Sequence, residues 1–185
     1  MAAALLEGVP NLTVRVVPDY TKLDEPADFL SAVRFSNAMN ADVHVAVHTN
    51  AGGTADGTDT FYLATSSRAK MLAASVQKRV APVSPGSDGG IHAQTGWAEL
   101  ASTRAVACLV ELAFHTNKAD AESIIAQPGL YAAALADGVC DYLHITRVAK
   151  AAADPEYKAA RRAFLRLPKA LREKFLRYAP KWRVA

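Results

Sequence analysis

The chain has 185 residues, 51% of them hydrophobic and 21% charged, with a formal net charge of +3. This length and composition predict one globular core with an appendage. No run approaches the roughly 18 to 20 continuous apolar residues of a membrane-spanning helix, and the opening MAAALLEGVP has neither the basic region nor the apolar length of a secretory signal peptide.

The first part of the chain alternates strand and helix patterns. Residues 12–17 (LTVRVV) have the composition of a strand. Residues 25–41 follow as a helix, with Asp24 as the candidate N-cap and Pro26 in the first turn. Residues 42–48 (DVHVAVH) alternate valine with other residues, which predicts a second strand with both of its histidines on one face.

The middle of the chain repeats this alternation. We expect a strand over 57–63 and a helix over 66–80. Residues 81–96 are rich in Gly, Pro and Ser, so we interpret them as a loop. The apolar run 105–112 (AVACLVEL) then predicts a buried strand.

Two further helices, over about 118–126 and 129–144, complete the pattern. Alternating elements of this length are typical of an α/β fold, here a mostly parallel twisted sheet flanked by helices on both faces. We therefore predict an α/β domain over residues 1–145 and a basic helical tail over 146–185.

Two residues stand near strand ends, where α/β sheets place their functional sites. His48 ends its predicted strand and is followed by TNAGG, while Glu111 lies near the end of the apolar run. A carboxylate in such a run is costly to bury unless a charged or hydrogen-bonding group faces it. We predict that His48 and Glu111 share one site.

Three stretches together resemble a known family: ADVHVAVHTNAGGTADGTDTFYL, SDGGIHAQTGWAELASTRAVACLVELAFHTNKAD and YAAALADGVCDYL. The family is that of the zinc-dependent N-acetylmuramoyl-L-alanine amidases of cell-wall hydrolases and phage endolysins, and the likeness covers roughly residues 3 to 144. Its most specific part is an ordered set: the His-x-Asn step at His48, a glycine before an aromatic strand, and Leu-Val-Glu-Leu-x-Phe-x-x-Asn around Glu111.

The resemblance implies a zinc ion held by two histidines and a glutamate, with a second glutamate as the general base. His48 takes the place of the second zinc histidine and Glu111 that of the catalytic glutamate. Zinc with an open position polarises a carbonyl and lowers the pKa of bound water, and a carboxylate beside it can move the water's proton to the leaving amine.

The sequence also departs from the family. It has no counterpart of the first strand, of the Gly-His-Gly loop with the first zinc histidine, or of the ligand glutamate on the following helix. We therefore expect a chain truncated at its N-terminus relative to the family, or one begun at a late start codon. Such a chain would bind zinc weakly, because three protein ligands fix a catalytic zinc.

The other histidines are weaker candidates. Four residues along a strand span about 13 Å, so His44 and His48 are too far apart to share one ion at about 2 Å, and we interpret His44 as a core or helix-facing residue. His92 either approaches the substrate groove or is a solvated loop residue. We interpret His115 as a turn residue and expect His144 to cap the last helix.

The last 40 residues differ in charge from the rest. Residues 146–185 contain 12 Lys and Arg against 3 Asp and Glu, whereas residues 1–145 contain 9 against 15. One face of the tail would carry the large side chains Tyr157, Phe164, Leu171, Phe175, Tyr178 and Trp182. The tail either packs on the domain or binds an anionic wall polymer or membrane surface. No motif supports nucleic acid as a partner.

Two functions of different classes follow. The first is a peptidoglycan hydrolase that uses zinc-activated water to cleave the N-acetylmuramoyl-L-alanine amide bond. The second is a catalytically inactive, amidase-like module that binds the cell wall. With no visible signal peptide, we expect synthesis in the cytoplasm and action on the wall after secretion or phage-mediated release.

Overall fold

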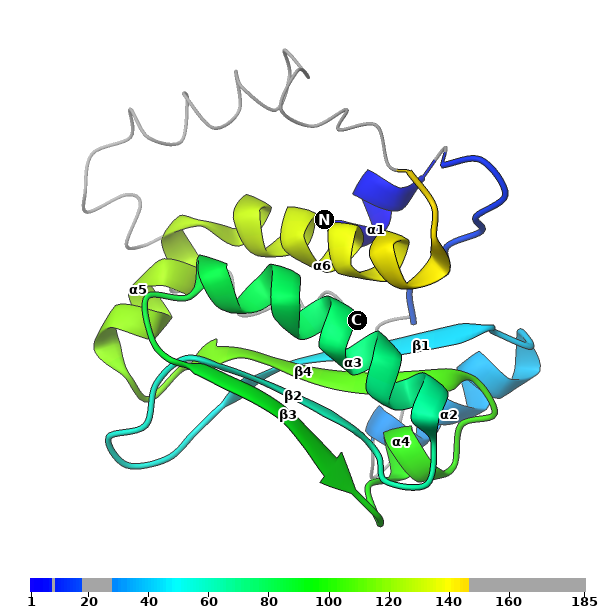
Figure 1. Cartoon of the computed structure of the whole chain (residues 1–185), viewed down its shortest axis with the longest axis horizontal. Coiled ribbons are helices and arrows are strands. Elements are labelled where there is room, and N and C mark those ends of the chain that lie inside the picture. Colours follow the sequence, from blue (N-terminus) through cyan, green and yellow to red (C-terminus); the bar gives the residue numbers. More distant parts are fainter. Residues whose placement is uncertain (8, 18–27, 147–185) are drawn as a thin grey trace.

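The computed structural model describes residues 1–7, 9–17 and 28–146 (Figure 1). The helical elements are α1 (Ala2–Leu6), α2 (Asp28–Ala38), α3 (Ser67–Val80), the 3₁₀ turn η2 (Ala81–Val83), α4 (Ala98–Ala101), α5 (Lys118–Ala126) and α6 (Pro128–Leu143). The strands are β1 (Val43–Asn50), β2 (Thr58–Leu63), β3 (Asp88–Gln94) and β4 (Val106–Phe114). The predicted N-cap Asp24, Pro26 and the tail from residue 147 lie outside the described residues.

The four strands form one sheet in the order β1-β4-β2-β3. β1 pairs with β4 and β2 with β3 in parallel, and an antiparallel contact between β2 and β4 joins the two pairs. The last strand in the sequence, β4, thus lies in the middle of the sheet, in agreement with its almost continuous apolar run. The prediction of a mostly parallel sheet is confirmed.

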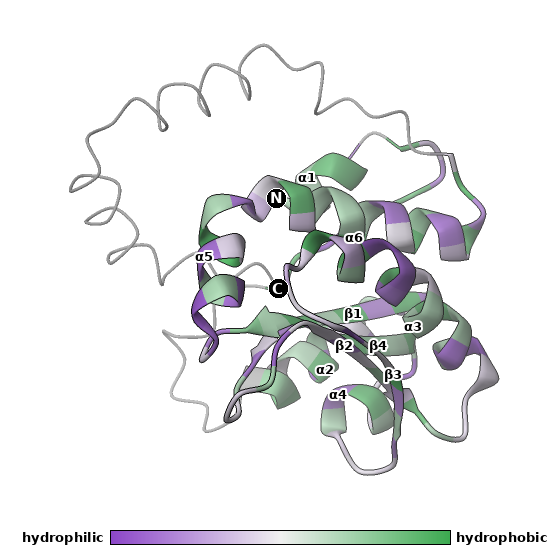
Figure 2. Ribbon diagram, turned by 60° about the vertical axis from the view of Figure 1, so that its left-hand side comes forward, coloured by the Kyte–Doolittle hydropathy of each residue, from purple (hydrophilic) through white to green (hydrophobic). Residues whose placement is uncertain are grey.

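Helices cover both faces of the sheet, with α3 and α6 on one side and α2 and α4 on the other (Figure 1). In Figure 2 the strands lie between these two layers of helices. On the first side Leu72 and Val76 of α3 pack against Val110 of β4. On the second side Leu100 of α4 packs against Leu109 of β4. Because side chains alternate along a strand, β4 contributes to both cores.

Local sequence signals explain where the helices begin. The Ser66 hydroxyl accepts a hydrogen bond from the amide of Ala69 and caps α3, and the Asn117 side chain accepts from Ala119 and Asp120 at the start of α5. Such caps satisfy amides that have no partner within the helix. No helix within the described ranges is both long and apolar enough to span a bilayer.

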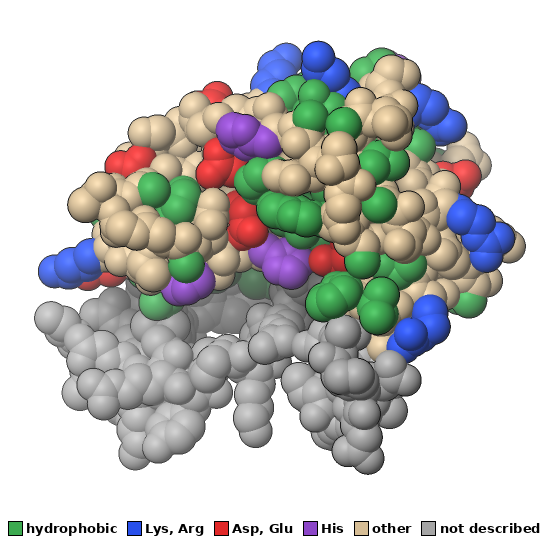
Figure 3. Space-filling model, turned by 90° about the horizontal axis from the view of Figure 1, so that it is seen from below, with side chains coloured by type: hydrophobic (Ala, Val, Ile, Leu, Met, Phe, Trp, Pro, Cys, Tyr) green, Lys and Arg blue, Asp and Glu red, His purple; other side chains and the backbone are tan. Residues whose placement is uncertain are grey.

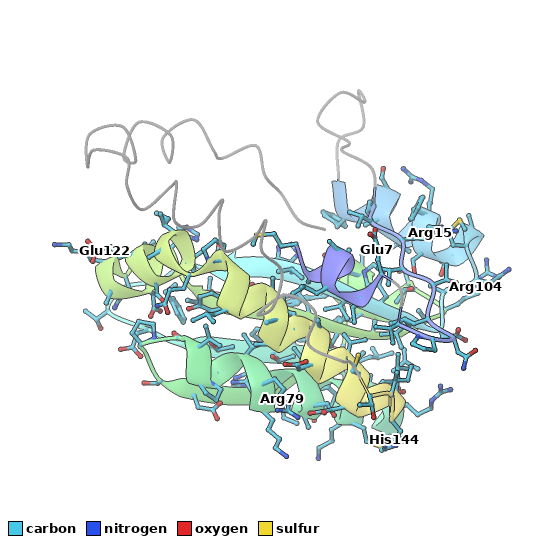
Figure 4. The ribbon with its side chains drawn as sticks, turned by 90° about the horizontal axis from the view of Figure 1, so that it is seen from above. Glu7, Arg15, Arg79, Arg104, Glu122 and His144 are labelled. Atoms are coloured by element: carbon cyan, nitrogen blue, oxygen red, sulfur yellow. The ribbon has the colours of Figure 1, made fainter. Side chains whose placement is uncertain are left out.

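The helices α3 and α6 approach each other closely. A Cβ atom on Gly138 of α6 would lie 2.8 Å from the Cα of Val76 on α3, so only glycine fits there without a shift. On the outside of the same pair, Arg79 (labelled in Figure 4) donates two hydrogen bonds to Asp141, at 2.6 and 2.9 Å. Charge-assisted bidentate pairs of this kind fix geometry as well as distance.

Two predicted elements are wrong. Residues 12–17 form no strand; Leu12 and Val14 instead pack against the cluster of Leu6, Ala136 and Cys140 between α1 and α6. The predicted loop 81–96 contains the strand β3, whose two glycines weaken the strand signal in the sequence. The strands predicted at 42–48, 57–63 and 105–112 are present, with shifts of one or two residues at most of their ends.

Candidate active site

The candidate site lies on the face of the sheet that carries α4. Backbone register places His48 of β1 opposite Glu111 of β4, and Asp59 of β2 opposite the same glutamate on its other side. Three polar residues therefore stand side by side on three adjacent strands. Figure 3 shows this face, with histidine and acidic side chains interleaved among hydrophobic ones.

Glu111 is a half-buried carboxylate in an otherwise apolar strand. Burial raises the pKa of Glu111, and nearby Asp59 raises it further, while His48 and His115 act in the opposite direction. Its Oε2 atom is buried and has no hydrogen-bond partner among the described residues. An unpaired buried oxygen on a carboxylate with a raised pKa is typical of a proton-transfer group.

Glu99 of α4 connects the two histidines of β1. Its Oε2 lies 3.2 Å from Nε2 of His48, and its Oε1 lies 3.7 Å from Nε2 of His44. Burial alone would raise the pKa of Glu99, but the hydrogen bond with His48 and the charges of His48 and His44 outweigh it and lower this pKa to about 2. The prediction that His44 faces the core or a helix is confirmed, because it is buried against α4.

A second histidine–carboxylate pair lies on the other side of Glu111. Nε2 of His92 is 2.8 Å from Oδ1 of Asp59, whose Oδ2 accepts a hydrogen bond from the Asn50 side chain at 3.3 Å. His92 thus belongs to β3 and not to a loop, which corrects the solvated-loop interpretation. Its pairing with Asp59 places it on the face of the sheet that carries Glu111.

The two remaining histidines lie where the sequence predicts. His115 follows β4 in a turn, with Nδ1 3.1 Å from the hydroxyl of Thr49. His144 is the C-cap of α6, with a φ of 55° and a backbone N–H bonded to the carbonyls of Asp141 and Cys140. His144, labelled in Figure 4, lies at the end of α6.

A buried carboxylate holds the loops around the site. Oδ2 of Asp120 accepts hydrogen bonds from the amides of Gly57 and Phe114, at 2.7 and 2.9 Å, and its Oδ1 accepts one from Ser84 at 3.2 Å. Gly57 has a φ of 91°, and a Cβ there would collide with the backbone of Ser87. Asp120 therefore holds the start of β2 and the end of β4 together.

The described residues do not form a complete zinc site. Among them no group of three His, Cys, Asp or Glu side chains is placed to hold a metal ion. Nε2 of His44 and Nε2 of His48 each face the carboxylate of Glu99 instead. Since a catalytic zinc takes three protein ligands, His48 could be one of them but needs others.

The electrostatics of Glu111 predict a stability effect. Because the pKa of Glu111 is raised in the folded state, the protein loses stability as pH rises through the range in which this side chain ionises. Glu111→Gln in the metal-free chain should therefore increase the free energy of unfolding at pH 7. We expect a gain of no more than about 1 kcal/mol, since water screens part of the cost of a half-buried charge.

Urea unfolding of Glu111→Gln and the parent at pH 7 and below pH 4 checks this prediction. The gain should vanish at acid pH, where the parent carboxyl is also neutral. Glu122→Gln on α5 is the control, because this glutamate side chain is 70% exposed. An equal gain at both pH values would show that ionisation of Glu111 is not its cause.

A comparison with known protein families finds a match over most of the chain. A family profile described as N-acetylmuramoyl-L-alanine amidase matches residues 2–141. Comparison with curated protein sequences finds no significant match.

Solved structures of amidases resemble the fold. The catalytic domain of CwlV, an N-acetylmuramoyl-L-alanine amidase from Bacillus (Paenibacillus) polymyxa var. colistinus, aligns with a TM-score of 0.68 and 24% identity, over 78% of this chain and 80% of that one. An amidase from Clostridium difficile 630 aligns at 0.59 and 29%, over 64% and 66%. AmiC2 of Nostoc punctiforme aligns at 0.61 and 21%, over 77% and 78%.

Proposed function

The chain belongs to the N-acetylmuramoyl-L-alanine amidase family, and on that premise we propose that it is a peptidoglycan hydrolase that cleaves the amide bond between the lactyl group of N-acetylmuramic acid and L-alanine. The observation that carries the proposal is Glu111. It is a half-buried carboxylate with a raised pKa and an unpaired oxygen, next to His48 at the strand ends.

Glu111 would act as the general base. Its carboxylate takes a proton from the attacking water while the water oxygen bonds to the amide carbon. It then gives that proton to the nitrogen of L-alanine as the carbon–nitrogen bond breaks. A raised pKa suits both steps, because the group must accept and release a proton near neutral pH.

We further propose zinc as the cofactor, on the resemblance to the family and with His48 as one ligand. The other ligands are not among the described residues, so no step of the mechanism is assigned to the metal. Glu99 would hold His48 in place, since its carboxylate lies 3.2 Å from Nε2 of that ring. Carboxylate partners orient metal-binding histidines in this way in many proteins.

The zinc proposal predicts weak metal binding by the 185 residues alone. After dialysis against zinc-free buffer, we expect well under one zinc per chain by elemental analysis, because the described residues bring no three ligand side chains together and one imidazole cannot replace three ligands. His48→Ala should lower the residual binding, whereas His144→Ala at the far end of α6 should not. Tightly held, stoichiometric zinc would show that a different ligand set exists.

Digestion of purified peptidoglycan tests the function. Two proteins are assayed. One is the chain alone, and the other is a fusion in which the first strand, Gly-His-Gly loop and first helix of a related amidase are joined to the N-terminus of the chain. We expect the active form to release new L-alanine amino termini without new reducing sugar ends, because it cuts an amide and not a glycosidic bond. New reducing ends would contradict the proposal, and wall binding without any release would identify a binding module instead.

A further inference from the structure

Three ring side chains pack against one another, tilted, in a row beside the candidate site. The ring of Phe61 lies 4.7 Å from that of Trp97 and 5.1 Å from that of His92, centroid to centroid, at interplanar angles of 43° and 33°. We call Phe61, His92 and Trp97 the aromatic strip. Trp97 is 40% exposed and the His92 side chain 43% exposed, while Phe61 is partly buried against the core below.

The aromatic strip is continuous with the candidate site. Phe61 lies two residues after Asp59 on β2, so both side chains are on one face, and Asp59 is opposite Glu111. At the other end, Trp97 immediately precedes α4, and Glu99 in the first turn of that helix contacts His48. A molecule bound at Glu111 can therefore extend over these rings.

The chemistry of the strip suits a sugar. A pyranose ring has an apolar C–H face, which packs on an aromatic ring, and a polar edge of hydroxyl and acetamido groups. Nε2 of His92 is paired with Asp59, which leaves Nδ1 for a ligand at the polar edge. One exposed tryptophan is ordinary, but a row of contacting rings that combines apolar faces with an oriented imidazole is typical of a binding site.

The charges around the strip distinguish the two halves of the substrate. Asp59, Glu99 and Glu111 are three carboxylates on this face, with Asp59 opposite Glu111 in the strand register and Glu99 in the helix that follows Trp97. The stem peptide carries free carboxylates and would be repelled here. The glycan strand is neutral once its lactyl group is in amide linkage, so it escapes this repulsion.

We propose that the aromatic strip binds the N-acetylated sugar chain of peptidoglycan, with Trp97 as the stacking platform and His92 as the polar contact. This assignment rests on the proposed function, which supplies peptidoglycan as the substrate. It adds that the glycan part of peptidoglycan contacts the aromatic strip beside Glu111. The glycan lies over β2 and β3, and the stem peptide leaves in another direction.

Fluorescence of Trp97 tests the proposal in the full chain. The chain has two tryptophans, so Trp182→Phe leaves Trp97 as the only one. The probes are a tetramer and a hexamer of N-acetylglucosamine, which are uncharged, and the free L-alanyl stem peptide. We expect saturable quenching or a spectral shift with both glycans and none with the stem peptide at the same concentrations.

Calorimetric titration with the same glycans then assigns the effect to the strip. Trp97→Ala and His92→Ala should weaken glycan binding by about tenfold, and Trp97→Phe should retain most of it because an aromatic face remains. Met71→Ala is the matched control, since Met71 is 59% exposed on α3, on the opposite side of the sheet. It should leave glycan affinity unchanged.

Three outcomes would overturn the proposal: a response of Trp97 to the stem peptide alone, no response to any probe, or unaltered glycan affinity in Trp97→Ala. These measurements need no turnover, so they are separable from the test of function. A chain that binds glycan through Trp97 but releases no L-alanine would refute the hydrolase and retain this inference. An active chain whose Trp97 variants bind glycan normally would support the hydrolase and refute glycan binding by the aromatic strip.

Discussion

Replacing Glu111 by glutamine in the active fusion should lower the rate of amide cleavage by about 10² to 10⁴, the usual cost of losing a general base. The glutamine amide has nearly the same shape as the carboxylate and can still form hydrogen bonds. It cannot accept a proton, so water attack and departure of the amine both lose their proton carrier. Release of L-alanine amino termini under single-turnover conditions measures this rate.

Metal content separates this role from that of His48. Glu111→Gln should retain the zinc of the fusion, whereas His48→Ala should lose zinc together with activity, since a ligand is removed. Glu122→Gln, exposed on α5, should change neither. If Glu111→Gln keeps a rate near that of the parent, Glu111 is not the base, and the role implied by the family does not apply at this position.

Asp120→Ala should cause the largest loss of stability of any substitution considered for this protein. Asp120 is fully buried, and the change leaves the amides of Gly57 and Phe114 and the hydroxyl of Ser84 without their acceptor. Each buried donor left unsatisfied costs about 1 to 3 kcal/mol. We expect a loss of roughly 3 to 5 kcal/mol, a large part of the stability of a domain of this size.

Urea unfolding monitored by circular dichroism measures this loss. Asp120→Asn should cost less, because one oxygen remains to accept from the backbone amides. Glu122→Ala lies two residues further along the same helix and controls for changes in α5 itself. A loss below about 1 kcal/mol for Asp120→Ala would mean that water replaces the carboxylate and that the loops do not depend on it.

Strong local patterns made part of this structure predictable. The alternating valines of β1 and the apolar run of β4 identify both strands, and a carboxylate within such a run identifies Glu111 as exceptional. The glycine-rich turn that follows β1 is the local signal for His48 as a candidate. Such residues can be identified from the sequence alone, since burial and strand periodicity depend on a few neighbouring positions.

The partners of these residues depend on distant parts of the chain. Glu99 belongs to a helix of four residues, too short to leave a periodic pattern, and meets His48 only through tertiary packing. Asp59 lies at the start of β2, and the rule that sites form at the carboxyl ends of parallel strands does not find it. It reaches Glu111 because β2 runs antiparallel to β4, which no local pattern predicts.

The order of the strands also bears on how the site comes into existence. β1 and β2 follow each other in the sequence but do not pair, because β4 occupies the place between them. His48, Asp59 and Glu111 can therefore meet only after the chain has been made through residue 114 and β4 has inserted. Such long-range pairing predicts slow folding with a high contact order. A nascent chain that ends before β4 lacks Glu111, so the three residues of the candidate site cannot yet come together in it.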